Sequence, residues 1–599
     1  MKRSLRTIIL FAALLASPSF VFAEDIGLNK AKEVAEMFFA KSGQALTRSG
    51  STLTLVNSAE VSATRAGSAP ALYIFNRAEG GFVIVSGSDA AMPILGYSFE
   101  NSFGDINDMP ENLSNWLDFY RGQINERRAS GIRTTEAELA RWKEALVLTR
   151  ADGAPKTVDL QTPDFGQGKP FNTYCPLDTL GKKTIVGCVA TAISEIVAYY
   201  KYPAAGSGTL PAYTTKGIKV PERPLGHAYK WDKILPKYSG VSYTDEQSEA
   251  VATLCYDIAV MIKASFGSSA TSGYTNRASY LADYMGYSKG MIKEGRSYST
   301  AEEWKALLKN SIDASKPVLF SGSNASAGHA FVIDGYDSSD RFLINFGWNA
   351  SSNGFYQIDA FGSYTKSQTA YLGVNPDDGL DYQENLVLVA TTQNGISYTG
   401  LAYNSGKMSP GQTVNIYFGA VQNNGTKTAT NIVMNIAYCN RNGEIKGWCL
   451  DSDFTKSSLS SGTYTWWNST KALKIPKGIT IERGDYLEAF YKSDRVHEWT
   501  RFGYSKASDT KMVGRMPCHI EEFSTFEYDK KTDVVTIRTF APTTSTWDIY
   551  DSNNESVKTQ SGARNSVGRI TFTRSNLPSG KYRLVSTSGE QTLELEIIL

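Results

Sequence analysis

The sequence GCVATAISEIVAYY, residues 187–200, predicts a helix near the middle of this 599-residue chain. Its apolar side chains recur at helical spacing on one face: Val189, Ile193, Ile196, Val197 and Tyr200. Tyr202-Pro203 follows, and a proline just past such a pattern is typical of a helix end. We therefore expect the helix to begin at or just after Cys188.

Cys188 is a candidate nucleophile because of this position. The first turn of a helix has unpaired backbone N–H groups and the positive end of the helix dipole, which favour a thiolate over a thiol. The thiolate is the reactive form of cysteine. The alternative is that Cys188 is a small buried hydrophobic residue, which is a common fate of a free cysteine.

Length and composition limit the class of protein. A chain of 599 residues is too long for one core, so we expect about three to five domains. Hydrophobic residues make up 41% and charged residues 20%, as in ordinary globular proteins. The net charge of +1 argues against nucleic acid or an anionic membrane surface as a partner.

The N-terminus resembles an export signal. A basic start, Met-Lys-Arg-Ser-Leu-Arg, precedes an apolar run over residues 8–15 and the small-residue site Val21-Phe22-Ala23. We expect residues 1–23 to be a signal peptide and the mature protein to be secreted, to the periplasm, the cell surface or the outside. An N-terminal core helix is the alternative. No later run reaches 18 apolar residues, so no transmembrane segment is expected.

Six cysteines are too few for a disulfide framework in an exported chain of this length. Cys439 and Cys449 flank a predicted turn at Asn442-Gly443, and whether they form a disulfide is left open. Apart from Cys188, the remaining three cysteines are expected to be buried thiols: Cys175, Cys255 and Cys518.

Residues 24–150 predict a compact α+β unit. A helical pattern over 28–39 precedes two strands at 71–75 and 81–86, and a second helix is expected near 113–120. A polar helix and an exposed link follow, and Arg150 lies in a segment suited to cleavage.

The rest of the chain divides into an α+β block and a strand-rich part. Residues 151–376 have helices first and strands after, which indicates an α+β domain. Beyond residue 376, alternating strands separated by turn signals are typical of β-sandwiches. We expect two immunoglobulin-like modules, at 377–515 and 516–599.

The chain has four histidines: His227, His329, His497 and His519. No His-Glu-x-x-His or Cys-x-x-Cys motif is present, so neither a metal site nor a cofactor is expected. His329 lies in the strand-like sequence GHAFVIDG, residues 328–335. A satisfied, half-buried polar residue is the ordinary alternative for such a histidine.

Asn345 is expected to lie opposite His329. If residues 335–339 form the loop of a hairpin, Asp334 pairs with Asp340, and counting outward brings His329 opposite Asn345. Asn345 would then accept from a ring N–H of His329, completing a Cys–His–Asn arrangement. A role in the following glycine-rich turn is the alternative for Asn345. His329 follows Cys188 by 141 residues, inside the range of about 130–150 found in papain-type enzymes.

Further residues are candidates for oxyanion and substrate binding. Gln167 precedes an extended segment upstream of Cys188, and its amide with the Cys188 N–H would form a two-donor oxyanion hole. An ordinary loop role is the alternative for Gln167, and a core role for Trp348. Candidate substrate contacts are Trp348, Phe346, Gly328, Ser269 and Ser272, the two serines lying in the loop 267–273.

Several motifs together resemble the streptopain family of cysteine peptidases. They are QGKPFN (167–172), GCVATA (187–192), GHAFVIDG (328–335) and NFGW (345–348). YIFN (73–76), GFVIVSG (81–87) and ILGY (94–97) resemble that family's inhibitory propeptide, so the resemblance covers about residues 24–376. The family commonly has tryptophan where this chain has Phe346, which puts contacts at the wall of the substrate cleft in question.

The resemblance implies a secreted, papain-like endopeptidase that is made as a latent zymogen and acts on protein or peptide substrates. It implies Cys188 as nucleophile, His329 as base, Gln167 in the oxyanion hole, and residues 24–150 as an intramolecular inhibitor. Two rivals remain from other classes. One is a different Cys–His hydrolase or transferase, such as a cell-wall amidase or a transglutaminase-like enzyme. The other is an inactive surface-binding protein.

Overall fold

The computed structural model describes the following residues: 24–43, 53–57, 69–105, 109, 111–130, 134–147, 153–323, 328–358, 368–393, 396–406, 408–504, 515–518, 525–529, 533–538, 546–561, 569–574, 577–578, 580–588 and 591–598. The expected signal peptide, Arg150 and His519 lie outside them. The chain forms two compact units. The first comprises Met1–Thr157, Tyr336–Leu343 and Ser351–Tyr364, and the second comprises Val158–Gly335, Ile344–Ala350 and Thr365–Leu599.

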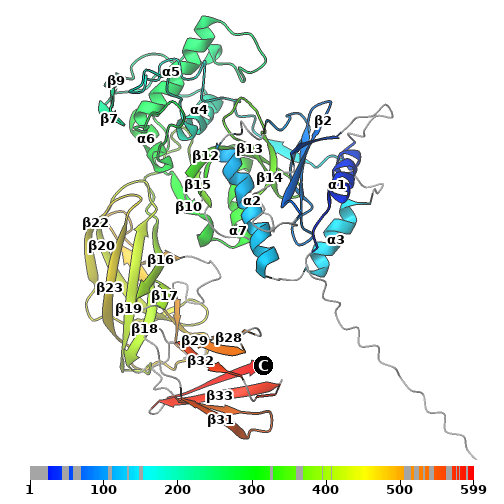
Figure 1. Cartoon of the computed structure of the whole chain (residues 1–599). Helices are drawn as coiled ribbons and strands as arrows, with labels where there is room; N and C mark the ends of the chain where they lie inside the picture. The colour runs from blue at the N-terminus through cyan, green and yellow to red at the C-terminus, as the bar shows by residue number, and fades with distance from the viewer. Residues whose placement is uncertain are drawn as a thin grey trace, which may run out of the picture. The chain divides into compact units, whose positions relative to one another are not determined.

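The first unit is built on antiparallel strands in the order β1-β2-β3-β4-β14. The strands are β1 (Leu53–Asn57), β2 (Leu72–Arg77), β3 (Phe82–Ser86), β4 (Ile94–Ser98) and β14 (Gly354–Gln357). The helices are α1 (Leu28–Lys41), α2 (Glu111–Ser130) and α3 (Glu136–Ala145). In Figure 1, α2 lies on one side of these strands and α1 and α3 on the other.

The helix patterns read from the sequence are present in this unit. α1 buries Ala31, Val34, Ala35, Phe38 and Phe39, the stripe expected of an amphipathic helix. These residues pack with Tyr73, Phe75, Val83 and Val85 of the sheet in one apolar cluster. α2 is longer than predicted, because its polar second half stays helical to Ser130. α3 begins with a capping box in which Thr135 and Glu138 exchange hydrogen bonds.

The first part of the second unit contains helices and five neighbouring strands of an 11-stranded sheet. The helices are α4 (Cys188–Tyr200), α5 (Asp245–Met261), α6 (Tyr280–Tyr284) and α7 (Ala301–Asp313), with short 3-10 helices η2 (Trp231–Lys233), η3 (Thr275–Ser279) and η4 (Arg296–Tyr298). These strands have the order β13-β12-β11-β15-β10: β13 (Arg341–Asn345), β12 (Gly328–Asp337), β11 (Val318–Ser323), β15 (Gln368–Leu372) and β10 (Ile292–Gly295). Short strands are β5 (Thr157–Asp159), β6 (Thr209–Leu210), β7 (Tyr213–Thr215), β8 (Ile218–Val220) and β9 (Arg223–Pro224).

Helix α4 begins at Cys188, as predicted, but it is more deeply buried than a single apolar stripe requires. All residues from 189 to 198 are buried, including Thr191, Ser194 and Glu195. A helix that is enclosed on every side belongs to the interior of a large core. α4 therefore provides a rigid base for the residues at its N-terminus.

The hairpin that carries His329 and Asn345 differs from the prediction. β12 extends to Asp337 and β13 begins at Arg341, so the loop comprises residues 338–340. Asp340 therefore lies in the turn and does not pair with Asp334, and the register that set Asn345 opposite His329 does not follow. The error arose because Tyr336 and Asp337 read as turn residues, whereas Asp337 in fact binds the amide N–H groups of Ser339 and Arg341 at 2.8 and 2.9 Å and closes a tighter turn.

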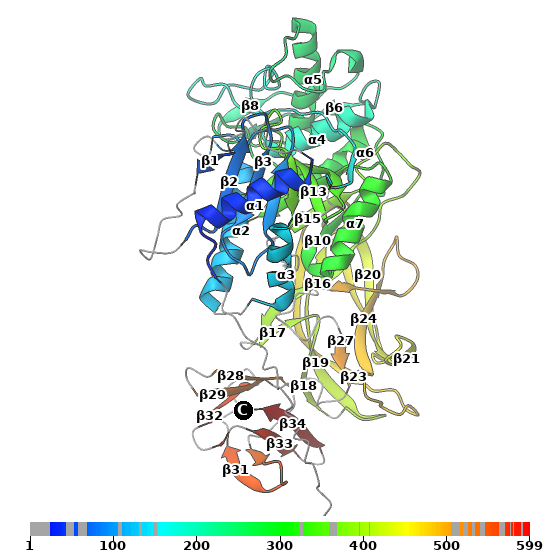
Figure 2. The same ribbon diagram turned by 90° about the vertical axis from the view of Figure 1, so that its right-hand side faces the viewer.

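Residues 386–518 form two six-stranded sheets (Figure 2). One contains β16 (Leu386–Gln393), β17 (Ile396–Thr399), β18 (Leu401–Gly406), β19 (Thr413–Asn423), β23 (Tyr464–Lys474) and β26 (Gly503–Tyr504). The other contains β20 (Ala429–Cys439), β21 (Ile445–Trp448), β22 (Phe454–Leu459), β24 (Tyr486–Lys492), β25 (Thr500–Arg501) and β27 (Arg515–Pro517). Residues of both sheets share one core, which is the arrangement of a β-sandwich.

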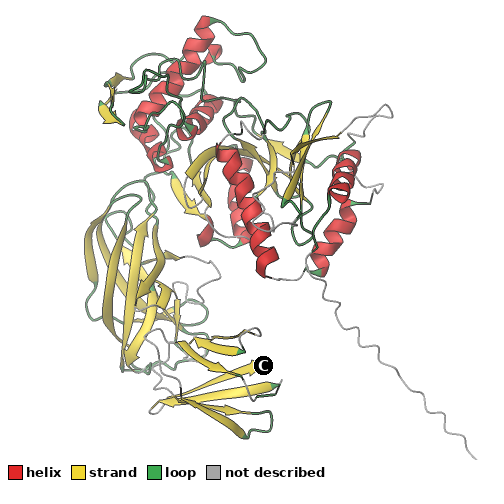
Figure 3. Ribbon diagram, in the orientation of Figure 1, coloured by secondary structure: helices red, strands yellow, loops and turns green. Residues whose placement is uncertain are grey.

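The boundary after this sandwich lies later than predicted. We placed the division at residues 515–516, but β27 pairs with β24 and Met516 and Cys518 lie in the sandwich core. The remaining described strands form a three-stranded and a four-stranded sheet: β28 (Thr525–Asp529), β29 (Val534–Arg538), β30 (Thr546–Tyr550), β31 (Ser556–Ser561), β32 (Arg569–Thr573), β33 (Lys581–Ser588) and β34 (Gln591–Ile598). In the described residues every helix ends by Asp313, and strands dominate beyond it (Figure 3).

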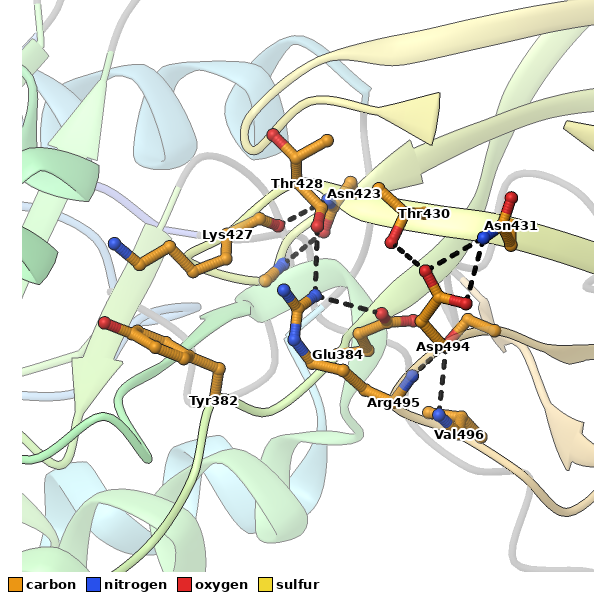
Figure 4. Close-up of polar contacts among 12 residues, drawn as sticks. Tyr382, Glu384, Asn423, Lys427, Thr428, Thr430, Asn431, Asp494, Arg495 and Val496 are labelled. Atoms are coloured by element: carbon orange, nitrogen blue, oxygen red, sulfur yellow. Dashed lines mark hydrogen bonds and ion pairs between the residues drawn. The ribbon is translucent and has the colours of Figure 1, made fainter. Parts of the chain in front are cut away.

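Polar contacts close one edge of the sandwich (Figure 4). Arg495 donates from Nη1 to Glu384 Oε1 at 3.2 Å and to the Thr428 carbonyl at 2.9 Å. Asp494 accepts from the amide of Asn431 at 3.0 Å. Because Glu384 is nearly fully buried, its pairing with Arg495 offsets the cost of removing a carboxylate from water.

The cysteines are all free thiols in the described structure. Cys439 packs with Phe490 on one face of its sheet, whereas Cys449 lies in the core between the two sheets. The two side chains therefore belong to different clusters and are not joined. In the described residues no helix combines the length and hydropathy that a bilayer span requires, and no group of three or more metal-ligating side chains occurs there.

Candidate active site

Cys188 is the first residue of α4 and is partly exposed, whereas the helix behind it is buried. Its N-cap residue Gly187 has φ of 90°, a backbone conformation that favours glycine. A Cβ at Gly187 would lie 2.6 Å from the Thr271 carbonyl oxygen, so a side chain there would displace backbone. Local backbone geometry thus allows the thiol to emerge at the start of a helix without a side-chain cap.

The loop 267–273 is fastened to the segment that leads into Cys188. The Ile185 N–H donates to the Gly267 carbonyl at 3.1 Å, and Thr271 Oγ1 donates to the Ile185 carbonyl at 2.7 Å. Ser269 and Ser272 are exposed on this loop. The two predicted pocket serines therefore lie on a loop that touches the residue before Cys188.

Gln167 lies beside the same segment. It is 5% exposed, and its backbone carbonyl accepts from the Val186 N–H at 3.0 Å. This hydrogen bond joins the backbone of Gln167 to a residue two positions before Cys188. The contact brings the predicted oxyanion-hole segment to the start of α4, although the two are separated by twenty residues of chain.

His329 is the second residue of β12 and is 8% exposed. It is opposite Gly322 of β11, and Gly328 is opposite Ser323. The other described histidine of this part of the chain is engaged elsewhere, because His227 Nε2 lies 2.7 Å from Oδ2 of the fully buried Asp257. That carboxyl group also accepts from Arg223, which indicates a structural role for His227.

Asn345 ends β13 and is 3% exposed. Its Nδ2 donates to the Pro163 carbonyl at 3.0 Å and to Thr162 Oγ1 at 3.4 Å, and its Oδ1 accepts from the Gly347 N–H at 3.1 Å. Asn345 thus holds the turn that follows it, the alternative that the sequence left open.

The two aromatic candidates lie in different surroundings. Trp348 is partly buried. Phe346 is 1% exposed and packs on Phe331, with ring centroids 5.6 Å apart. A contact between Phe346 and substrate would therefore require this ring to become accessible.

Two buried carboxyl groups near these residues were not singled out from the sequence. Glu195 of α4 is fully buried, and burial raises its pKa well above the ordinary value, with the charges of Asp164 and Asp334 adding to the effect. Asp334 of β12 is 3% exposed, and burial raises its pKa to about 7. The signal for Glu195 was present, since it is the one charged residue in the apolar helix sequence of residues 188–200.

Comparison with known proteins adds to this geometry. Residues 165–356 match the Peptidase C10 family, and residues 23–124 match the Spi protease inhibitor family. Streptopain of Streptococcus pyogenes is 29% identical over 333 residues, which is 51% of this chain and 81% of streptopain. The thiol protease/hemagglutinin PrtT of Porphyromonas gingivalis is 31% identical over 372 residues, which is 58% of this chain and 42% of PrtT.

Among solved structures, a fragment of Prevotella intermedia prointerpain A is similar. It is 26% identical, with a TM-score of 0.44, and the match covers 54% of this chain and 99% of the fragment.

A buried helix that begins with a partly exposed cysteine, within a peptidase match and preceded by an inhibitor match, defines the class: this is a cysteine-type peptidase with an inhibitor-like propeptide. More narrowly, the Peptidase C10 match and the similarity to streptopain and PrtT support a streptopain-family cysteine peptidase zymogen. The predicted family and activity are confirmed, and neither the amidase or transglutaminase-like enzyme nor the inactive binding protein is favoured.

Proposed function

We propose that this protein is exported as a latent precursor and hydrolyses peptide bonds in proteins once its N-terminal segment has been removed. We assign Cys188 as nucleophile, His329 as base, Gln167 as an oxyanion donor and Asn345 as the residue that orients His329. The observation that carries the proposal is the position of Cys188. It is a partly exposed thiol at the first turn of a helix whose next ten residues are buried.

In the proposed reaction, His329 takes the thiol proton and the Cys188 sulfur attacks the peptide carbonyl carbon, so that a C–S bond forms. The Cys188 N–H and the Gln167 amide stabilise the negative oxygen of the tetrahedral intermediate. His329 then gives its proton to the leaving amine as the C–N bond breaks. Water, activated by His329, attacks the thioester and releases the carboxylic acid and the thiol.

Substitution of the nucleophile tests this assignment. We expect Cys188→Ala to lower the hydrolysis of a protein substrate such as casein by at least about 10³-fold, because no other group supplies the nucleophile. Cys175→Ala is a matched control, since Cys175 is also a free thiol but is 2% exposed, with a pKa raised to about 12 by burial. Retained hydrolysis in Cys188→Ala would reject the proposal.

Latency is supported by contacts within the first unit. β4, from the inhibitor-like segment, pairs with β14 from the peptidase match, with Tyr97 opposite Phe355. The Tyr97 hydroxyl donates to Asp337 Oδ2 at 3.0 Å. The inhibitor-like segment thus adds strand β4 beside β14, a strand that follows Trp348 in sequence. We propose that this contact keeps the peptidase inactive.

Comparison of the precursor with the trimmed enzyme tests latency. We expect uncleaved precursor to hydrolyse a peptide substrate at least about tenfold more slowly than enzyme from which residues 24–150 have been removed by processing. Equal rates would show that the segment does not inhibit. N-terminal sequencing of the active form locates the processing site, which we propose lies near Arg150, and shows whether residues 1–23 are removed.

We further propose a papain-like architecture for residues 151–376 and immunoglobulin-like folds for the two strand-rich modules. The papain-like assignment is supported by a nucleophile on a buried helix and a histidine on a strand. The two modules have three candidate roles: they bind substrate or a surface, they serve export, or they passively support the enzyme.

A further inference from the structure

Glu195 is an unusual residue for its position. It lies seven residues after Cys188 on α4, its side chain is fully buried, and the other residues of this helix carry no charge. Removing a carboxyl group from water is costly unless the protein provides hydrogen bonds in its place. A buried carboxyl group in the helix that begins with the nucleophile therefore requires an explanation from its contacts.

The first contact reaches the segment that carries Gln167. Glu195 Oε1 accepts from the Phe165 N–H at 3.1 Å. The Phe165 carbonyl in turn accepts from the Asn349 N–H at 2.7 Å. Phe165 is two residues before Gln167, so Glu195 attaches the oxyanion-hole segment to the nucleophile helix.

The second contact reaches the residues after β13. Asn345 Nδ2 donates to the Pro163 carbonyl at 3.0 Å, and Pro163 is two residues before Phe165. A Cβ at Gly347 would lie 2.9 Å from Thr191 Cγ2 and 3.7 Å from Glu195 Oε1. Because Thr191 and Glu195 are four residues apart on one helix face, this face supports the turn of residues 345–348.

The same network continues to the strand of His329. Asn345 Nδ2 donates to Thr162 Oγ1, and Thr162 donates from both its N–H and its hydroxyl to Asp334 Oδ2. Asp334 is on β12, as is His329. Hydrogen bonds to the segment of residues 162–167 therefore join the elements that carry all four proposed catalytic residues.

We propose that Glu195 is a positioning residue for catalysis: its hydrogen bond to Phe165 holds the segment of Gln167, and through that segment Asn345, in place on the helix of Cys188. The inference rests on the catalytic roles proposed above for these residues. Burial raises the pKa of Glu195, and the charges facing it, Asp164 and Asp334, are also acidic. The side-chain oxygen of a glutamine, which has the same shape, can also accept from the Phe165 N–H, so glutamine should replace Glu195.

Variants of Glu195 in the full-length chain, activated by its own processing, test the inference. We expect Glu195→Gln to keep kcat within about threefold of wild type. We expect Glu195→Leu, which has a similar size but cannot hydrogen-bond, to lower kcat by about 10–100-fold with KM within about threefold, because loss of one oxyanion donor costs about 10²–10³. Ser194→Ala is a matched control, since Ser194 is fully buried on the same helix but donates to Ala190 of its own helix.

The outcomes separate positioning from folding. If Glu195→Leu folds, as judged by circular dichroism and melting temperature, and keeps wild-type kcat, the inference is overturned. If Glu195→Leu does not fold, Glu195→Asp decides. It keeps the acid but is one methylene too short to reach the Phe165 N–H, so we expect kcat to fall at least about tenfold while Glu195→Gln is active. A wild-type kcat in Glu195→Asp would then overturn the inference that Glu195 positions the catalytic residues.

Failure of the inference and failure of the proposed function give different results. If Cys188→Ala is inactive but the leucine and aspartate variants of Glu195 have normal kcat, only the positioning role is wrong. If Cys188→Ala is active, the assignment of the nucleophile is wrong, whatever the Glu195 variants show.

Discussion

Asp334 and Asp337 are buried carboxyl groups on the same strand, β12, yet they are compensated in different ways. Asp337 belongs to the first unit and faces a cation: Arg341 Nε donates to its Oδ2 at 2.8 Å, and two backbone N–H groups and the Tyr97 hydroxyl complete its hydrogen bonds. Asp334 belongs to the second unit, and its Oδ2 accepts from the N–H and the hydroxyl of Thr162. Burial raises the pKa of Asp334 to about 7.

The difference shows two uses of a buried acid. An acid paired with arginine keeps its charge and anchors separate segments strongly, as Asp337 does for the inhibitor-like strand β4. An acid without a cation is easier to keep neutral and then serves as a hydrogen-bonding group in a network. Asp334 and Glu195 are of the second kind: Asp334 accepts from Thr162, and Glu195 accepts from the Phe165 N–H.

Removal of the Asp337 carboxylate should give the largest effect, because it leaves the 8%-exposed Arg341 as an unpaired buried charge. We expect Asp337→Ala, in an inactive Cys188→Ala background, to lower the free energy of unfolding by about 3–5 kcal/mol. Urea unfolding measures this change. Ser338→Ala, an exposed position in the same turn, should change it by less than about 0.5 kcal/mol. Similar values for the two variants would contradict the anchoring role.

The protonation of Asp334 should make stability depend on pH. Its folded pKa of about 7 lies above its ordinary value of 3.8, so the unfolded state releases the proton first, and stability is lost as pH rises from about 4 to 7. In the same Cys188→Ala background we expect Asp334→Asn to lack this loss. From about pH 4 to 7, the free energy of unfolding of this variant should rise relative to that of the Cys188→Ala parent by a few kcal/mol at most. Each unit of pKa shift corresponds to about 1.4 kcal/mol. Urea unfolding at pH 4, 5.5 and 7 measures the trend, and parallel curves would contradict a neutral Asp334.

Tyr97→Phe should have a smaller effect, since it removes one hydroxyl and keeps the ring that packs beside Arg341 at 5.0 Å. We expect a loss of about 1–2 kcal/mol and faster conversion of the precursor, because β4 is held less tightly. Electrophoresis of the precursor over time measures conversion. Tyr73→Phe is the matched control, because its hydroxyl donates to the Ile26 carbonyl within the inhibitor-like segment. Equal conversion rates in both variants would show that the hydrogen bond from Tyr97 to Asp337 does not by itself slow conversion of the precursor.

An exposed ion pair should matter least. Lys427 Nζ lies 3.0 Å from Asp283 Oδ1, but both side chains are about one third exposed, so solvent screens the pair. We expect Lys427→Met to change the free energy of unfolding by less than about 1 kcal/mol, and the change to disappear in 1 M salt. A loss as large as that of Asp337→Ala would show that burial does not set the strength of these pairs.

Local sequence patterns were enough to find the elements that carry the site. The helix of Cys188, the strand of His329 and helix α1 were each predicted within a few residues, because periodicity and flanking glycines or prolines act over short distances. The predicted hairpin register was wrong because it, too, was read from neighbouring residues alone. Asp337 reads as a turn residue from its neighbours, but its contacts with Arg341 and Tyr97 extend the strand.

The sequence by itself therefore determined the family, the order of the parts, and Cys188 at the head of a helix, since these depend on motifs and on local conformation. Only the tertiary structure decided that residues 336–343 and 351–364 join the N-terminal unit, and that Glu195 and Asp334 both accept hydrogen bonds from the segment of residues 162–165. Pairings between residues far apart in the chain depend on how complete layers pack, and burial, which sets the cost of each charge, exists only after that packing is formed.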